Sequence, residues 1–533
     1  MTVSIDPAPI GIPLAKAYAR LEQSRFADAL WSRRLDVWTT DPAVQQKIAH
    51  RLGWLDAMDV VVPHVARLRA CAQSVRDDGI TDIVLLGMGG SSLAPEVLRR
   101  VIGVAPGFPR FRVLDSVDPD AVRDAMDRAA TSIFVLASKS GTTIEPNVMA
   151  AEAERRLRLA GITETGSRFI AITDPDTALH ARATEHRFRE VFVNPADIGG
   201  RYSALSFFGA VPAAMMGIDV DALLASAATM RDMCRAGDPR TNPGLALGAA
   251  MAAAALTGRD KLTLRMPDHL EPFGLWVEQL VAESTGKQGK GVVPITGEPP
   301  DSPLGDDRFV VNVSLDAPLD LGAEFFRWEV ATAAAGFLLD INPFDEPNVQ
   351  QAKDATRALL AIFEVEGRLP APEPHASIEG ARLTLSNAAQ ERLAGDDVLT
   401  FLQVIGARDY FNVLAYLPSE DPALGDALRQ FRAHAGKTRR CATMLGYGPR
   451  YLHSTGQLHK GGANNGVFVI VTAAPSEDLA IPGEKYSFGV LEQAQAVGDF
   501  QSLDRAGRRA LHIQLPDRSP ELLRRVFARL QAS

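Results

Sequence analysis

The stretch that decides the fold is "SIFVLASKSGTTIEPNVMAAEAERRLRLA", residues 132–160. It begins with a short apolar run typical of a buried strand, and from Ile144 it has the spacing of a helix. Between the two lies a turn that holds one glycine, one cation and four hydroxyl side chains: Ser138, Lys139, Ser140, Gly141, Thr142 and Thr143. A helix start needs one hydroxyl as a cap, so four of them with a lysine indicate a bound anion.

Units of this kind repeat along the chain. The runs "DIVLLG", "FRVLDSV", "SIFVLAS", "RFIAITD" and "REVFVNP" alternate with helical stretches, which predicts βαβ units and a parallel sheet. A second series, "KLTLRMP", "GVVPI", "RFVVNVSL" and "GFLLDIN", follows an alanine-rich helix that begins near Leu245. A third, "YFNVLAYL", "ATMLGYG", "VFVIVTA" and "RALHIQL", follows a proline-rich linker from Arg368. We therefore predict an α/β protein with a helical region at 1–75, α/β domains at 76–245 and 246–365, and a C-terminal α/β region at 366–533.

Composition limits the partners. The 533 residues are 46% hydrophobic and carry a formal charge of -9, which gives no general attraction to nucleic acid or to anionic membranes. An anionic ligand should therefore be small and held by local cations. The three cysteines, Cys71, Cys234 and Cys441, lie far apart, which favours a reducing, cytoplasmic location. The N-terminus does not read as a secretory signal, and "LALGAAMAAAALTG" is shorter than the roughly 20 residues of a spanning helix.

A second hydroxyl-bearing turn lies in "DIVLLGMGGSSLAPEVLRR", residues 82–100. Its glycines at 87, 89 and 90 allow close approach of the backbone, and Ser91 and Ser92 precede the helix. Two such turns on neighbouring strands favour a monophosphate at the carboxyl edge of the sheet. The dinucleotide-binding fingerprint fails because Ser92 replaces its third glycine, although Asp115 keeps that alternative open. A "GKT" at Gly436 lacks the first glycine of a Walker A loop.

Several titratable residues are candidates for chemistry. Glu283 is expected near the carboxyl end of a helix, where the helix dipole and a glycine- and lysine-rich turn suit a general base with a raised pKa. Arg201 follows two glycines and could equally be a solvated loop residue, as Lys353 could be a solvated helix residue. His453 and His459 are six residues apart and do not share a helix face, so they indicate acid or base work rather than a metal site.

Five motifs resemble those of the glucose-6-phosphate isomerase family and occur in its order: "GMGGSSLAP", "SKSGTT", "GGRYSALS", "VEQLVAESTGK" and "NPFDEPNVQQAK". The likeness covers most of residues 45–475 and is strongest to the isomerase half of bacterial transaldolase/isomerase fusions. It implies two doubly wound parallel-sheet domains of the sugar isomerase (SIS) type, N-terminal helices and a C-terminal α/β extension. A separate transaldolase barrel does not fit, so isomerase activity alone is expected.

The resemblance implies reversible conversion of glucose 6-phosphate to fructose 6-phosphate through a cis-enediolate, in glycolysis and gluconeogenesis, with no metal or organic cofactor. Glu283 would move the proton, Arg201 would stabilise the enediolate, and Lys353 with a histidine would open the sugar ring. The implied phosphate site consists of Ser91, Ser138, Lys139, Ser140 and Thr143. Further candidates for the substrate site are Gly90, Gln279, Glu346 and His459.

The chain departs from the family pattern at two places. Position 346 is Glu where the family has Gln, and no histidine lies between Glu283 and Lys353, where the family has one. A relocated segment should therefore deliver His453, with His459 as the rival. In the family this histidine comes from a second subunit, so a homodimer is possible. The alternatives are an isomerase of another anionic sugar (mannose 6-phosphate or a sulfonated hexose), a non-catalytic phosphosugar-binding protein and a nicotinamide-dependent oxidoreductase.

Overall fold

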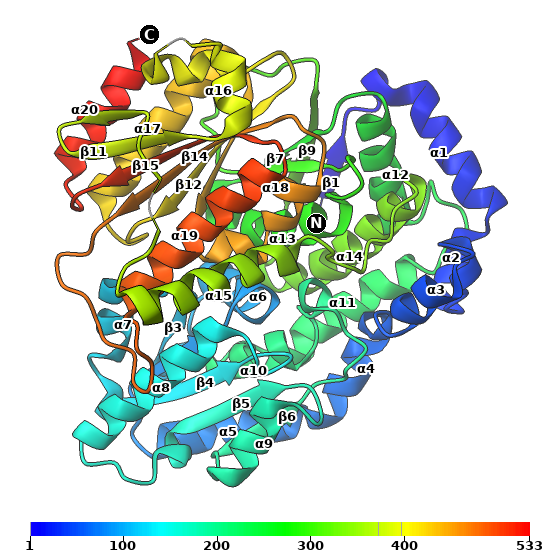
Figure 1. Ribbon diagram of the computed structural model, residues 1–533. Coiled ribbons are helices and arrows are strands. Elements are labelled where there is room, and N and C mark those ends of the chain that lie inside the picture. The colour runs from blue at the N-terminus through cyan, green and yellow to red at the C-terminus, as the bar shows by residue number, and fades with distance from the viewer. Residues whose placement is uncertain (1, 371, 396, 533) are drawn as a thin grey trace.

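The computed structural model describes residues 2–370, 372–395 and 397–532, and it contains three sheets surrounded by helices (Figure 1). The first sheet has the order β3-β2-β4-β5-β6, and all its strands are parallel. Its strands are β2 (Asp82–Leu86), β3 (Arg110–Leu114), β4 (Ser132–Ala137), β5 (Phe169–Thr173) and β6 (Glu190–Val193). The predicted α/β class with a parallel sheet is confirmed.

Both faces of this sheet are covered by helices. Ile83 and Leu85 belong to one apolar cluster and Val84 and Leu86 to another, as the alternation of side chains along a buried strand requires. The helices of this part of the chain are α6 (Leu93–Val101), α7 (Pro119–Met126), α8 (Ile144–Leu159), α9 (Ala178–Glu185), α10 (Phe207–Met215) and α11 (Val220–Met233).

The second sheet is smaller and has the order β1-β9-β7-β8. β7 (Lys261–Arg265) is parallel to β8 (Val293–Ile295) and to β9 (Arg308–Ser314). The N-terminal β1 (Thr2–Ile5) pairs antiparallel with β9, whereas the sequence predicted only helices before residue 75. Its four residues are too few for a recognisable alternation, and its partner lies about 310 residues away in Val311 to Ser314.

The third sheet combines parallel strands with an antiparallel edge, in the order β10-β11-β15-β14-β12-β13. Its strands are β10 (Ala376–Ile378), β11 (Ala381–Leu385), β12 (Tyr410–Tyr416), β13 (Ala442–Tyr447), β14 (Gly466–Ala473) and β15 (Arg509–Leu515). Its helices are α16 (Asn387–Leu393), α17 (Pro422–Arg439), α18 (Gly456–Gly461), α19 (Phe488–Arg505) and α20 (Pro520–Gln531). The predicted C-terminal α/β extension is therefore present.

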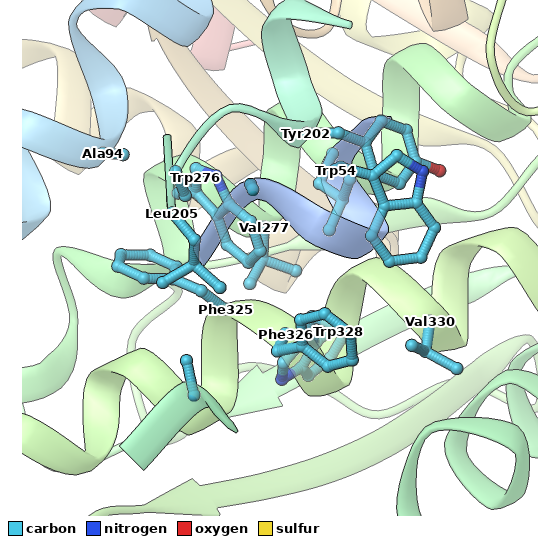
Figure 2. Close-up of a cluster of buried hydrophobic side chains, with 14 of the residues drawn as sticks. Trp54, Ala94, Tyr202, Leu205, Trp276, Val277, Phe325, Phe326, Trp328 and Val330 are labelled. Atoms are coloured by element: carbon cyan, nitrogen blue, oxygen red, sulfur yellow. The ribbon is translucent and has the colours of Figure 1, made fainter. Parts of the chain in front are cut away.

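The centre of the molecule is built around helix α14 (Leu321–Leu338), all of whose residues are buried. Figure 2 shows the aromatic cluster on this helix, in which Trp276 and Phe325 lie 4.7 Å apart and Trp54 packs against Phe326. Trp54 also contacts Tyr202, with ring centroids 5.2 Å apart. The cluster therefore fixes the backbone next to Arg201. The N-terminal helices are α1 (Gly11–Gln23), α2 (Phe26–Trp31), α3 (Pro42–Ala49), α4 (Ala57–Val61) and α5 (Val65–Asp77).

One predicted strand is wrong. "GFLLDIN" begins inside α14 and ends in the turn before α15 (Val349–Glu366). A short apolar run does not distinguish a strand from a helix that is buried on all sides, and α14 is such a helix.

The alanine-rich helix is α12 (Pro243–Leu256), and it packs closely against α14 as its small side chains predicted. A Cβ atom at Gly248 would lie 2.4 Å from the carbonyl oxygen of Ala331, so only glycine allows this approach. In the described part of the chain, no helix combines the length and apolar character that crossing a bilayer requires.

Candidate active site

The two hydroxyl-rich turns lie side by side at the carboxyl edge of the first sheet. They follow β2 and β4, which are adjacent parallel strands, and the direction in which strands are added reverses between them. Open α/β sheets bind their ligands at this position. A cleft of about 570 Å³ opens here, and all five predicted phosphate-binding residues line it: Ser91, Ser138, Lys139, Ser140 and Thr143.

Helix capping does not account for the hydroxyl groups. Ser92 and Thr143 occupy the N-cap positions of α6 and α8, but neither side chain caps its helix. Within the second turn, Ser140 Oγ lies 2.9 Å from Thr142 Oγ1, and Ser138 Oγ accepts a hydrogen bond from the amide of Gly141 at 3.1 Å. The turn is thus ordered by its own contacts and presents hydroxyl groups to the cleft.

The charge of Lys139 is already shared. Its ammonium group contacts the carboxylate of Asp174 and donates to the carbonyl of Ala196 at 2.8 Å. Burial raises the pKa of Asp174, and Lys139 opposes that effect. Arg51 supplies a second cation to the cleft wall. Sequence reasoning missed both Asp174 and Arg51, although the place of Asp174 directly after β5 is a signal that could have identified it.

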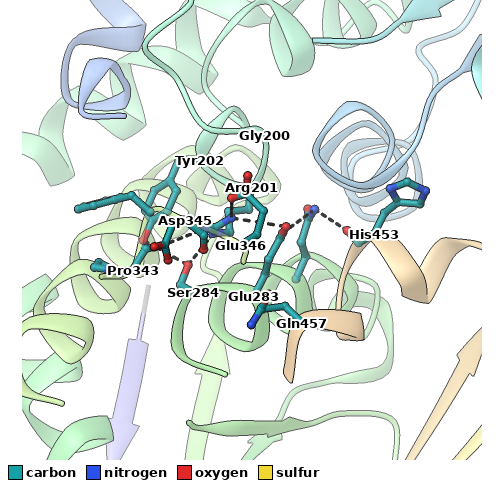
Figure 3. Close-up of polar contacts among 12 residues, drawn as sticks. Gly200, Arg201, Tyr202, Glu283, Ser284, Pro343, Asp345, Glu346, His453 and Gln457 are labelled. Carbon is teal, nitrogen blue, oxygen red and sulfur yellow. Dashed lines mark hydrogen bonds and ion pairs between the residues drawn. The ribbon is translucent and has the colours of Figure 1, made fainter. Parts of the chain in front are cut away.

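Arg201 is buried, so the solvated-loop interpretation is wrong. Its side chain is 3% exposed and donates from Nε to Ser284 Oγ at 2.8 Å and from Nη2 to the carbonyl of Pro343 at 2.9 Å. Its Nη1 lies 3.5 Å from Glu283 and 3.0 Å from Glu346 (Figure 3). The guanidinium of Arg201 is therefore held between the carboxylates of Glu283 and Glu346, and all three residues line the cleft.

Glu283 lies near the carboxyl end of α13 (Phe273–Thr285), as predicted. Its Oε2 accepts a hydrogen bond from Gln279 at 3.3 Å, and both residues line the cleft. Burial raises the pKa of Glu283; Arg201 counteracts this, and the charge of Glu346 adds to it. A buried carboxyl group with a raised pKa beside a fixed cation is suited to general-base chemistry.

Glu346 and Lys353 come from the segment after α14. Glu346 lies in the irregular segment that precedes α15, and Lys353 lies in α15; both line the cleft. Burial would raise the pKa of Glu346, but Arg201 outweighs it and holds the pKa below its usual value. Glu346 therefore places a second carboxylate beside Arg201, in addition to Glu283.

His453 enters the cleft from the third sheet. It ends a short 3-10 helix, η12 (Arg450–His453), and its Nε2 donates to Glu145 Oε1 at 2.9 Å. Gln495 on α19 donates to the same oxygen at 2.7 Å. Although burial would raise it, these donors hold the pKa of Glu145 below its usual value. Sequence reasoning missed Glu145 and Gln495, because only the fold brings α8 and α19 together.

His459 does not reach the cleft. It is 1% exposed inside α18, and its Nε2 accepts a hydrogen bond from Asn412 Nδ2 at 3.0 Å. Burial lowers its pKa well below the usual value for histidine. Of the two rivals, the structure brings only His453 together with Glu283.

The two sequence motifs that suggested a nucleotide site do not form one in the structure. Asp115 makes two hydrogen bonds of 2.7 Å to Arg450, so its carboxylate is not free for a ribose. Gly436 lies within helix α17 and not in a loop. Among the residues that the structure describes, no group of three or more His, Cys, Asp or Glu side chains is arranged to hold a metal ion.

Residues 57–294 match the sequence profile described as phosphoglucose isomerase. This part of the chain is therefore similar to the phosphoglucose isomerase family. The matched region contains both hydroxyl-rich turns, Arg201 and Glu283, whereas Lys353 and His453 lie beyond it.

Curated relatives carry the name glucose-6-phosphate isomerase. The protein of Prochlorococcus marinus (strain MIT 9313) is 31% identical over 283 residues, which are 51% of each chain. That of Cyanothece sp. (strain PCC 7425 / ATCC 29141) is 26% identical over 431 residues, covering 68% of this chain and 80% of the relative. The chain thus spans about half the length of several of the isomerases it matches.

Two solved structures are similar to the chain. A glucose-6-phosphate isomerase from Chlamydia trachomatis D/UW-3/Cx is 19% identical, with a TM-score of 0.49 over 64% of this chain and 78% of that one. A hypothetical protein from Thermus thermophilus is 18% identical, with a TM-score of 0.47 over 99% of this chain and 93% of that one.

Proposed function

We propose that this protein is a glucose-6-phosphate isomerase that interconverts glucose 6-phosphate and fructose 6-phosphate. The observation that carries the proposal is the position of the Glu283 carboxylate, which shares one cleft with the hydroxyl-rich turns and lies 3.5 Å from Arg201. A base, a fixed cation and an anion site within one cleft are the parts that aldose-ketose isomerisation needs.

The hydroxyl-rich turns would hold the phosphate group. Ser91, Ser138, Ser140 and Thr143 donate hydroxyl hydrogen bonds in this proposal, and Lys139 exchanges part of its contact with Asp174 for the phosphate. Because the sugar is held by its charged end, carbons 1 and 2 extend toward α13.

Glu283 would take the proton from carbon 2 and return it to carbon 1. The electron pair of the broken C–H bond forms a double bond between carbons 1 and 2, and the carbonyl pair moves to the oxygen on carbon 1, so an enediolate forms and negative charge develops on oxygen. The hydroxyl proton on carbon 2 moves to the oxygen on carbon 1, and the carbonyl re-forms at carbon 2 when carbon 1 takes the proton from Glu283. Arg201 stabilises this charge from a position that its bonds to Ser284 and Pro343 fix in advance. The raised pKa of Glu283 makes it a better proton acceptor than an exposed carboxylate.

Lys353 and His453 would open the sugar ring by moving a proton between the ring oxygen and the hydroxyl group. The Glu145 carboxylate accepts from His453 Nε2, so Nε2 carries the hydrogen and Nδ1 is left to exchange a proton. Every side chain named here comes from one chain, so the homodimer that the resemblance suggests is not required to complete the site.

Three further points belong to the proposal. The three cysteines are buried and free, in keeping with a cytoplasmic location and a role in glycolysis. The narrower likeness to transaldolase fusions stays a prediction. A cradle of hydroxyl groups also fits a sulfonate, so mannose 6-phosphate and a sulfonated hexose should be compared as substrates by kcat/KM.

The test is the variant Glu283→Gln in a coupled assay for conversion of fructose 6-phosphate. Removal of a general base should lower kcat between about 10²-fold and 10⁴-fold, while calorimetric binding of fructose 6-phosphate persists. Glu278→Gln is the control, because Glu278 is on the same helix but bonds Thr296 outside the cleft. An unchanged kcat in Glu283→Gln rejects the assignment of the base.

A further inference from the structure

The segment that carries His453 lies across three strand ends of the first sheet. In the sequence it follows β13, a strand of the third sheet. Arg450, at the start of η12, reaches the residue after β3, and His453, at its end, reaches Glu145 after the turn of β4. Between them, at the end of β2, a Cβ atom on Gly89 would lie 2.8 Å from the carbonyl oxygen of His453. The segment therefore rests on β3, β2 and β4 in spatial order.

The contact at β3 is a two-point ion pair. Arg450 Nε and Nη2 each donate to Asp115 at 2.7 Å, and Asp115 is 2% exposed. A planar guanidinium paired with a carboxylate at two points defines orientation as well as distance. A 3-10 helix has three residues per turn, so the side chains of residues 450 and 453 project from the same face. The orientation of Arg450 therefore determines the direction in which the imidazole of His453 projects.

The other anchors of the segment do not replace this ion pair. Tyr451 donates to Asp499 at 2.7 Å, which ties the segment to helix α19, beside its own sheet. Gln279 donates to the carbonyl of His453 at 2.7 Å, which holds the backbone rather than the side chain. Besides the hydrogen bond from His453 to the Glu145 carboxylate, the Arg450–Asp115 ion pair is a second charged contact from the segment to the first sheet.

We propose that the ion pair between Asp115 and Arg450 seats His453 in the cleft, so that both are positioning residues for the proposed reaction. This inference rests on the proposed function for its kinetic test. It also assigns a use to Asp115, which the sequence pattern had associated with a nucleotide.

The test compares four single variants by kcat, KM and thermal stability: Asp115→Asn, Arg450→Met, Arg450→Lys and Arg112→Met. Arg112 is the matched control, because it lies on β3 itself and pairs with Asp124 away from the cleft. Since a misplacement of about 1 Å costs roughly 100-fold in rate, kcat should fall by about that factor in Asp115→Asn and Arg450→Met. KM for fructose 6-phosphate should change little, because the phosphate turns are intact, and Arg112→Met should match the wild type.

Arg450→Lys keeps the charge but only one point of contact, so it should lie between the wild type and Arg450→Met. It also carries the test if Arg450→Met does not fold. The double variant Asp115→Leu with Arg450→Met removes both charges and avoids a lone buried ion. A folded double variant that keeps low kcat supports the role of the ion pair, whereas one with wild-type kcat overturns it. Wild-type kcat in any folded single variant at Asp115 overturns it as well.

A readout without turnover separates this inference from the proposed function. In protein labelled at histidine rings, the His453 resonance, identified by its loss in His453→Gln, should shift in Arg450→Met and not in Arg112→Met. If the wild type does not isomerise sugar phosphates, the proposed function fails while this shift still decides the seating of His453. A resonance that does not move in Arg450→Met overturns the inference.

Discussion

At the scale of the residue, the candidate site is governed by the sharing of charge. Arg201 is shared between Glu283 and Glu346, and Lys139 is shared with Asp174. Each cation is thus partly neutralised before substrate arrives, which lowers the cost of burying it. The raised pKa of Glu283 follows from burial and from the like charge of Glu346, with Arg201 opposing both.

Glu346→Gln tests this sharing. Gln can still accept from Arg201 but carries no charge, so the pKa of Glu283 should fall. Since the proposed base works when deprotonated, kcat/KM should rise with pH through the pKa of Glu283. The acid limb of its pH profile should therefore move to lower pH in the variant, and Glu278→Gln should leave the limb in place. A limb that moves to higher pH would contradict the coupling.

At the scale of the element, the site depends on direct backbone contact between two turns. The turn after β2 contacts η8 (Gly200–Tyr202), the short 3-10 helix that presents Arg201. A Cβ atom at Gly90 would lie 1.9 Å from the carbonyl oxygen of Gly200. Gly90, a predicted site residue without a functional group, lines the cleft and makes this close contact.

Gly90→Ala should separate the two turns and displace Arg201. Overpacking of this kind costs about 1–3 kcal/mol of the free energy of unfolding, and kcat/KM should fall with it. Gly237→Ala is the control, because a Cβ atom there meets nothing within 4 Å and the expected change is within about 0.5 kcal/mol. Urea unfolding and the coupled assay measure both effects. A Gly90→Ala enzyme with wild-type stability and activity would show that the two turns can part without consequence.

At the scale of the whole molecule, the three sheets meet around the cleft. Helices α15 and α19 lie side by side between the first and third sheets (Figure 1), and apolar residues of both helices share a cluster with β2 and β4. Arg518, after β15, pairs with Asp118 at the start of α7. These contacts join parts of the chain 400 residues apart. The division of the chain at residues 75, 245 and 365 stays a prediction.

Acid should destabilise the molecule through His512 of β15. Burial lowers its pKa to about 4, and its Nε2 hydrogen-bonds Thr472 Oγ1 at 2.9 Å. The pKa of His512 in the folded state lies below its unfolded value of about 6.5. Its contribution to the free energy of unfolding is therefore fully present above pH ~6.5 and falls by about 3 kcal/mol as the pH drops to 4. Between pH 7 and pH 4, the free energy of unfolding of His512→Gln, measured with guanidinium, should fall by about 3 kcal/mol less than that of the wild type. His50→Gln, at an exposed histidine, should follow the wild type; parallel curves for all three would refute the assignment.

The sequence by itself determined the α/β class, the parallel first sheet and the two hydroxyl-rich turns. These depend on short-range periodicity and on turn residues next to their strands, which are legible in one stretch of chain. It also placed Glu283 at the end of its helix, because the glycines that follow mark that end.

Four features are evident only from the tertiary structure. His453 rather than His459 lines the cleft, and Arg201 is buried. Strand β1 pairs with β9, and "GFLLDIN" begins inside α14. The tertiary structure also joins Asp115 to Arg450 across 335 positions of the chain. Each of these depends on which distant surfaces meet. Periodicity records whether a residue is buried, but not the partner that buries it, so such contacts exist only once the three sheets are assembled.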